Sequence, residues 1–211
     1  MKIIAHRGMW KDIQEKNSEK AFERAFNVNF GVETDIRDYK GELVVSHDIG
    51  SKESIALKDF LNLYKRIGNE NLLALNIKAD GISRLLLNAL DDYGVQNYFT
   101  FDMSVPEMVI YRNIECKYFS RQSDIEKECV LYDKCEGVWM DSFFSQDHIN
   151  HKKIMYHLQA GKIVVIVSPE LHGEDPVHIW EILKENDLFR EQRLCLCTDM
   201  PMEAKSFYGE E

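Results

Sequence analysis

Short apolar runs of strand length alternate with segments of helical periodicity along the chain, and this alternation constrains the fold more than any other feature. Repeated β-α units are typical of a parallel sheet covered by helices. The expected strands lie at residues 2–6, 32–36, 72–78, 98–101, 117–120, 137–141, 162–167 and 193–199. Eight such units in a chain of 211 residues predict an α/β fold, a TIM (βα)8 barrel, as a single domain spanning residues 1–211.

One further apolar segment falls outside this count. The segment ELVVSHD at 42–48 follows the second strand across the short polar turn DYKG, which ends in Gly41. A short turn of this kind between two strand-like runs is typical of a β-hairpin. We therefore expect an extra hairpin strand after strand 2.

The first helix is expected after Ser18, a favourable N-cap, with an apolar stripe of Ala21, Phe22, Ala25 and Phe26. Later helices are expected to begin near Leu57, Gly81, Val105, Ser123, Asp147 and Pro176. The last helix follows the turn Asp199-Met200-Pro201, where Asp199 can cap the helix and Pro201 suits its first turn.

Composition limits the partners and the compartment. A net charge of -10 argues against a nucleic acid or an anionic membrane as partner, because both would repel the protein. The apolar start is too short for a signal peptide and no later run reaches membrane-spanning length, so we expect a soluble, cytoplasmic protein. Five cysteines without a CxxC pair argue against a disulfide framework or a zinc cage, and Cys195 with Cys197 alone makes a poor metal site.

Polar side chains recur at the ends of two expected strands, where a parallel barrel forms its active site. Because side chains alternate along a strand, Glu33 and Asp35 share one face, and so do Asn76 and Lys78 on the third strand. Two neighbouring carboxylates in a low dielectric need compensation, which a divalent cation provides. Oxygen ligands favour Mg²⁺ or Ca²⁺ over zinc. The alternative is that Glu33 and Asp35 form ordinary ion pairs with Arg7, Lys78 or Arg37.

Two histidines lie at the same predicted rim. His6 ends the first strand beside Arg7, whose guanidinium fork suits a phosphate, while the imidazole can transfer a proton to or from an alkoxide. His47 ends the hairpin strand, and Asp48 can orient its ring or cap the turn. A histidine at the end of a strand is often only a hydrogen-bonded core or rim residue, so the functional interpretation rests on the convergence of the histidines with the acidic residues. His148 and His151 lack a nearby acidic pattern, so we interpret them as a solvated helix face rather than a metal site.

Taken together, these motifs resemble the glycerophosphodiester phosphodiesterase family. The resemblance lies in IAHRG, NSEKAFERAF, GVETDIRDYKGELVVSHD and LNIK, in this order, and in LCTDMP near the end of the chain. It implies a PI-PLC-like TIM barrel that uses a divalent metal to cleave glycerophosphodiesters into an alcohol and glycerol phosphate. Carried over to the matching positions, it implies that His6 and His47 are the general acid and base, Arg7 and Lys78 contact phosphate, and Glu33, Asp35 and Asn76 hold the metal.

The sequence departs from the family pattern at three places. Asn76 stands where relatives carry a third carboxylate ligand, so cation affinity should fall and the metal is expected to bind together with the anionic substrate. Lys16 stands where relatives commonly carry a glutamate of the rim. The stretch between Asp48 and Leu57 is too short for the subdomain that covers the substrate alcohol in many relatives, so a more open pocket is expected.

We therefore predict a metal-dependent phosphodiesterase with a small phosphodiester substrate. Two alternatives stay open: another phosphodiester, such as a sugar-phosphate polymer or a lysophospholipid, and a catalytically degenerate barrel that binds a phosphorylated ligand without cleaving it. The sequence indicates neither the substrate alcohol nor the oligomeric state.

Overall fold

The computed structural model describes residues 1–68 and 70–209 of the chain. These residues form two compact units, one comprising His6–Tyr118 and the other comprising Met1–Ala5 with the chain from Phe119 onward.

The His6–Tyr118 unit contains a mixed sheet flanked by helices. Its strands are β2 (Gly31–Tyr39), β3 (Glu42–Val45), β4 (Ile55–Ala56), β5 (Leu73–Ile77) and β6 (Tyr98–Phe101). Its helices are α1 (Glu19–Asn27), α2 (Leu57–Leu63), α3 (Ser83–Asp92) and α4 (Val105–Asn113). Strand β5 pairs in parallel with both β2 and β6, as the β-α alternation predicts.

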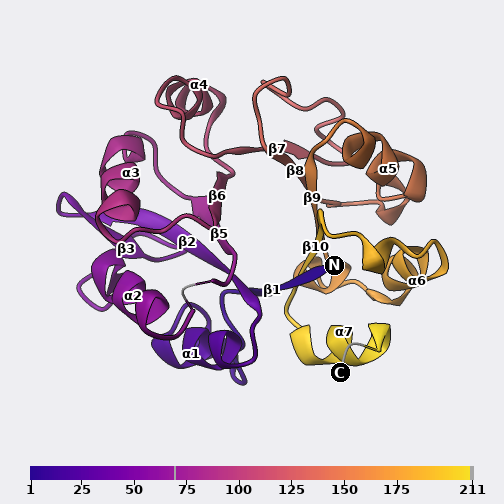
Figure 1. Cartoon of the computed structure of the whole chain (residues 1–211). Helices are drawn as coiled ribbons and strands as arrows, with labels where there is room; N and C mark the ends of the chain where they lie inside the picture. Colours follow the sequence, from indigo (N-terminus) through magenta and orange to yellow (C-terminus); the bar gives the residue numbers. More distant parts are fainter. Residues whose placement is uncertain (69, 210–211) are drawn as a thin grey trace. The chain divides into compact units, whose positions relative to one another are not determined.

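The extra hairpin strand is confirmed, because β3 pairs antiparallel with β2. Lys40 and Gly41 both have positive φ angles, 52° and 84°, at the tip of this hairpin. Two successive left-handed residues give the tight turn whose twist matches that of the flanking strands. The hairpin projects between α2 and α3 (Figure 1). The short strand β4, which was not predicted, pairs antiparallel with β3.

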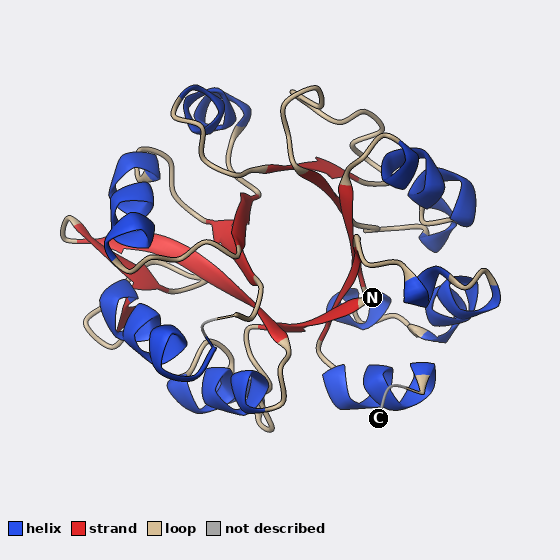
Figure 2. Ribbon diagram, viewed as in Figure 1, coloured by secondary structure: helices blue, strands red, loops and turns tan. Residues whose placement is uncertain are grey.

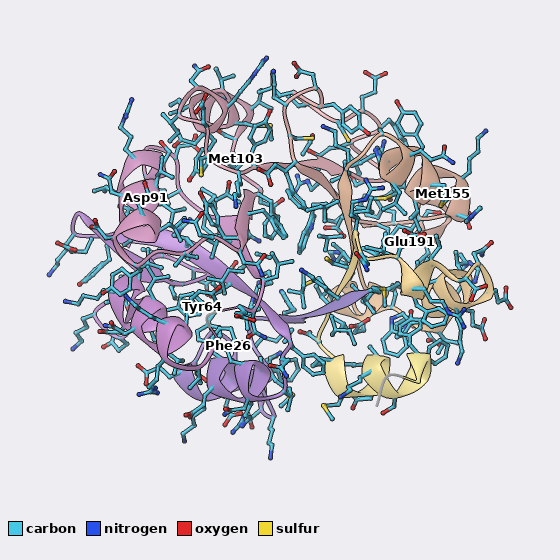
Figure 3. All side chains as sticks on the ribbon, in the orientation of Figure 1. Phe26, Tyr64, Asp91, Met103, Met155 and Glu191 are labelled. Atoms are coloured by element: carbon cyan, nitrogen blue, oxygen red, sulfur yellow. The ribbon has the colours of Figure 1, made fainter. Side chains whose placement is uncertain are left out.

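Helix α1 forms as its sequence predicts. The Ser18 hydroxyl accepts a hydrogen bond from the Ala21 amide at 3.3 Å, and the apolar stripe of α1 is buried. On that stripe, the ring of Phe26 lies 5.7 Å from the ring of Tyr64, in an edge-on arrangement that favours aromatic pairs (Figure 3). Tyr64 begins a π-helical turn, Tyr64–Gly68, that follows α2. A side chain at Gly68 would lie 2.7 Å from the Phe26 ring, so glycine permits this close packing.

The other unit contains a wholly parallel sheet. Strand β1 (Lys2–His6) pairs with β10 (Leu194–Thr198), β10 with β9 (Ile163–Val167), β9 with β8 (Gly137–Met140), and β8 with β7 (Phe119–Gln122). Its helices are α5 (His151–Gln159), α6 (Val177–Glu185) and α7 (Pro201–Tyr208). These helices lie along one face of this sheet (Figure 2).

The helix expected near Ser123 is wrong. Residues 123–136, all of which are described, form turns and bends. The Ser123 hydroxyl accepts hydrogen bonds from the amides of Ile125 and Glu126, and Leu131 has a φ of 52°. Two apolar residues of this segment, Ile125 and Val130, are exposed, and the Ser123 side chain competes with helical hydrogen bonding.

Three smaller expectations are also corrected. Strand β7 begins at Phe119, two residues later than expected. The residue that precedes α7 as its N-cap is Met200 rather than Asp199, whose amide donates to Glu170. His151 is exposed as predicted, but His148 is 5% exposed and accepts a hydrogen bond from Lys153 Nζ at 2.7 Å. Burial and the Lys153 charge lower the pKa of His148 to about 4.

All five cysteines are free thiols. A search of the described residues finds no helix with the length and hydrophobicity that crossing a bilayer requires.

Candidate active site

The loop after β1 makes a tight turn that directs two predicted site residues toward β2. The Arg7 amide donates to the Glu33 carbonyl at 3.0 Å, and the φ angles of Arg7 and Gly8 are 55° and 82°. A Cβ atom at Gly8 would lie 2.7 Å from the carbonyl carbon of Ala21, at the start of α1. Only glycine fits this combination of positive φ and close approach. Residues that the surrounding structure holds in a left-handed conformation cluster at functional sites.

The parallel pairing of β2 with β5 brings the predicted ligands together. Asp35 lies opposite Asn76 in the register, and Glu33 lies two residues earlier on the same face of β2. Glu33, Asp35 and Asn76 are 1%, 0% and 8% exposed. Lys78 directly follows β5, where its amide donates to the Ile36 carbonyl at 2.9 Å. The backbone therefore places two carboxylates, one amide and one ammonium in the same region of the sheet.

Asp35 is the most heavily engaged member of this cluster. Its Oδ2 atom lies 3.0 Å from Arg7 Nε, and its Oδ1 atom lies 3.4 Å from Lys78 Nζ. The ion pairs that the sequence left open as an alternative thus exist at Asp35. The third possible partner, Arg37, instead donates to the Lys78 carbonyl.

Asn17 also contacts Asp35, a contact that no sequence motif predicted. Its Nδ2 atom donates to Asp35 Oδ2 at 2.8 Å, and its Oδ1 atom accepts from the Thr34 hydroxyl at 2.8 Å. The hydroxyl donor fixes which way the Asn17 amide points. Asn17 has a φ of 57°, and its amide donates to the Arg7 carbonyl at 3.0 Å. The one sequence signal was its place in the NSEKAF motif, next to the N-cap Ser18.

Glu33 lies beside His6 and has a strongly perturbed pKa. Its Oε2 atom accepts from the Arg7 amide at 3.2 Å and lies 3.8 Å from His6 Nε2. Burial, together with the Asp35 charge, raises the pKa of Glu33 to about 8, and the charges of Arg7 and Lys78 oppose this rise only in part. A buried carboxyl that retains its proton near neutral pH is typical of functional sites.

His47 lies at the edge of this region. Ser46 directly follows β3 and precedes His47. The Ser46 amide donates to the Asp35 carbonyl at 3.0 Å. The His47 side chain is 46% exposed, and its Nδ1 atom lies 2.9 Å from Asp48 Oδ1. The structure therefore places His6 against a buried carboxylate, and it places His47 on the adjoining loop with Asp48 as its ring partner.

The oxygen atoms of the cluster suit a hard cation. Glu33 Oε1, Asp35 Oδ1 and Asn76 Oδ1 are buried and accept no hydrogen bond from any described residue. Unsatisfied buried oxygens are costly, and a cation that prefers oxygen ligands removes the cost. Nowhere in residues 1–68 and 70–209 do three His, Cys, Asp or Glu side chains gather as a metal site, which agrees with a neutral amide at position 76. The donors therefore fit a divalent cation with only two charged ligands.

Lys16, the second departure from the family pattern, adds a positive charge near the loop after β1. Its Nζ atom lies 4.6 Å from the centre of the Trp10 ring, a cation-π distance.

Comparisons with known proteins identify the fold. No protein family model matches the sequence, and no curated protein matches it. Solved structures do match. A glycerophosphodiester phosphodiesterase from Parabacteroides distasonis is 17% identical with a TM-score of 0.70, and the match covers 99% of this chain and 96% of that one.

Two further structures match along their lengths. A glycerophosphodiester phosphodiesterase from Agrobacterium tumefaciens is 14% identical with a TM-score of 0.71, and the match covers 100% of both chains. A phosphodiesterase from Oleispira antarctica, in complex with its product sn-glycerol-3-phosphate, is 14% identical with a TM-score of 0.71 and 100% and 97% coverage. This chain therefore has the TIM-barrel fold of the glycerophosphodiester phosphodiesterases, which confirms the predicted fold class.

Proposed function

We propose that this protein is a metal-dependent phosphodiesterase that hydrolyses a glycerophosphodiester-like substrate to an alcohol and a phosphomonoester. The observation that carries this proposal is the convergence of Arg7, Lys78 and two buried carboxylates beside His6. The shared fold supports it, because the phosphodiesterases that have this fold include one with a phosphomonoester product bound.

Each cationic side chain has a distinct task toward the phosphoryl group. Arg7 and Lys78 are each 21% exposed, so their charges are partly shielded from water and act strongly on an anion. The guanidinium can donate to two phosphoryl oxygens, and the ammonium adds a point charge. Both reduce the charge that develops on the phosphoryl oxygens during displacement.

His6 and His47 carry the proton transfers. One activates the nucleophile, either water or a neighbouring substrate hydroxyl, and the other protonates the leaving alkoxide. Asp48 holds Nδ1 of His47, which leaves Nε2 for the substrate. Glu33 Oε2 lies 3.8 Å from Nε2 of His6, within reach of the ring.

Glu33, Asp35 and Asn76 are the residues that would hold a divalent cation, Mg²⁺ or Ca²⁺. When bound, the cation would supply Lewis-acid stabilisation of the phosphoryl oxygens. Asn17 keeps the Asp35 carboxylate in a fixed orientation for this role.

The test is release of alcohol and phosphomonoester from a panel of phosphodiesters, with Mg²⁺, Ca²⁺ or chelator present. The panel contains glycerophosphodiesters, a lysophospholipid and a sugar-phosphate diester. His6→Ala and His47→Ala should each lower turnover by about 10²- to 10⁴-fold. His151→Ala is the matched control, because His151 is an exposed histidine of α5, and its turnover should equal that of the wild type. Near-native turnover in both site variants would refute the assignment.

Asn76 motivates the alternative of a barrel that binds a phosphorylated ligand without cleaving it. Asn76→Glu restores a third carboxylate opposite Asp35. Metal-dependent activity in the native protein excludes the binding-only alternative, whereas activity that appears only after this substitution supports it.

A further inference from the structure

The carboxylate best placed to hold a cation is already paired with the protein's own cations. Arg7 Nε and Asn17 Nδ2 both lie against Asp35 Oδ2, at 3.0 and 2.8 Å. Lys78 Nζ lies 3.4 Å from Asp35 Oδ1, the oxygen that accepts no hydrogen bond. A divalent cation on Oδ1 would therefore meet the Lys78 ammonium at short range. Two like charges in a partly desolvated site repel strongly.

The remaining ligands do little to offset that repulsion. Asn76 offers a neutral amide oxygen, which leaves Glu33 as the one further carboxyl group among the three side chains. A hard cation such as Ca²⁺ takes six to eight oxygen ligands, about twice the number that these three side chains provide as single donors. Added negative charge and added oxygen atoms are what the site lacks, and a phosphoryl group supplies both.

We propose, resting on the proposed phosphodiesterase function, that a phosphoryl anion and a divalent cation bind this site cooperatively, and that Lys78 couples them. Without an anion, Lys78 pairs with Asp35 and weakens cation binding. With an anion, the ammonium turns to a phosphoryl oxygen and releases Asp35 Oδ1 to the cation. The side chain is long and 21% exposed, so it can change partner without moving β5.

Thermodynamic linkage makes this coupling measurable without catalysis. If the anion raises cation affinity by some factor, the cation raises anion affinity by the same factor. The probes are Mn²⁺, followed by electron paramagnetic resonance of the free ion, and dimethyl phosphate, a simple phosphodiester. Titrations of the full-length protein should show Mn²⁺ binding at least about fivefold tighter when dimethyl phosphate is saturating, and the reciprocal calorimetric titration should give the same factor.

Lys78→Met keeps the length of the side chain and removes its charge. In this variant Mn²⁺ should bind more tightly than in the wild type when no anion is present, and the coupling factor should fall to about one. Lys65→Met is the control, because Lys65 is an exposed lysine in the same unit, and it should keep the wild-type coupling. Thermal unfolding of each variant verifies that it is folded.

Several results would overturn the proposal. Equal Mn²⁺ affinity with and without dimethyl phosphate refutes the coupling, although measured hydrolysis would leave the proposed function standing. Weaker Mn²⁺ binding by Lys78→Met refutes Lys78 as the coupling residue and makes it a structural support. Absence of Mn²⁺ binding under both conditions overturns the coupling and the metal dependence together, while hydrolysis in chelator would still demonstrate a phosphodiesterase.

Discussion

Glu33→Gln should make the metal-free protein more stable, and by an amount that grows with pH. Glu33 is 1% exposed, and its pKa rises from the usual 4.5 to about 8 because burial and the Asp35 charge disfavour ionisation. The folded state therefore binds a proton that the unfolded chain releases between these two values. Since the folded pKa of this acid is raised, stability is present at low pH and is lost as pH rises from 4.5 toward 8.

The magnitude follows from the two pKa values. Each pKa unit is worth 1.36 kcal/mol, so the penalty is about 1 kcal/mol near pH 5 and about 4 kcal/mol near pH 8. Glutamine has nearly the shape of the protonated acid and can still accept from the Arg7 amide. It removes the titration without opening a cavity. The difference in unfolding free energy between variant and wild type should therefore rise by roughly 3 kcal/mol across this range.

Urea unfolding in chelator, at several pH values from about 5 to 8, measures this difference. Taking the difference between two proteins cancels the titration of every other group. Glu23→Gln is the control, because Glu23 is exposed on α1, and its profile should run parallel to that of the wild type within about 0.5 kcal/mol. Parallel profiles for Glu33→Gln and the wild type would refute the reasoning, because they would mean that Glu33 ionises normally in the fold.

Three further predictions concern neighbouring parts of the molecule. Asn17→Ala removes a 2.8 Å hydrogen bond to buried Asp35 and should lower the unfolding free energy by about 1 to 3 kcal/mol, and phosphodiesterase turnover with it. Gly8→Ala should lower the melting temperature more than Gly81→Ala, because both glycines have positive φ but only Gly8 has backbone atoms within 3 Å of the added methyl group. Burial and nearby lysines lower the pKa of His157 to about 4, so protonation of this residue should cost up to about 3 kcal/mol of stability as pH falls from 6.5 to 4. The guanidinium unfolding midpoints of His157→Gln should not show this loss.

The placement of the candidate site residues follows in large part from local rules. Alternation along a strand places Glu33 and Asp35 on one face whatever the rest of the chain does. The parallel register then sets Asn76 opposite Asp35, because strands joined through an α-helix run in the same direction. The hairpin that leads to His47 was equally predictable, since the short polar turn between its two strands ends in Gly41, which adopts a positive φ.

The features that sequence missed depend on contacts between distant residues. Asn17 acts through Thr34 and Asp35, 17 and 18 positions away, and no periodic pattern marks such a hydrogen bond. His148 resembled a solvated residue because its helical spacing carries no information on burial by Lys153 and its neighbours. The expected helix near Ser123 failed for a local reason, since that hydroxyl satisfies two backbone amides in a turn.

The neutral side chain of Asn76 and the ion pairs of Asp35 together determine the net charge of the candidate site. With a third carboxylate, Arg7 and Lys78 would face three acids, and the metal-free cluster would carry a negative charge that attracts a cation by itself. With Asn76, two cationic side chains face two acids, one of which burial favours in its protonated form. Such a cluster attracts an anion first, despite the net charge of -10 on the whole chain. With an amide at this position, the bound anion supplies part of the negative charge that holds the cation. The cation affinities of the free protein and of its anion complex should therefore differ far more here than in a site where three carboxylates hold the ion.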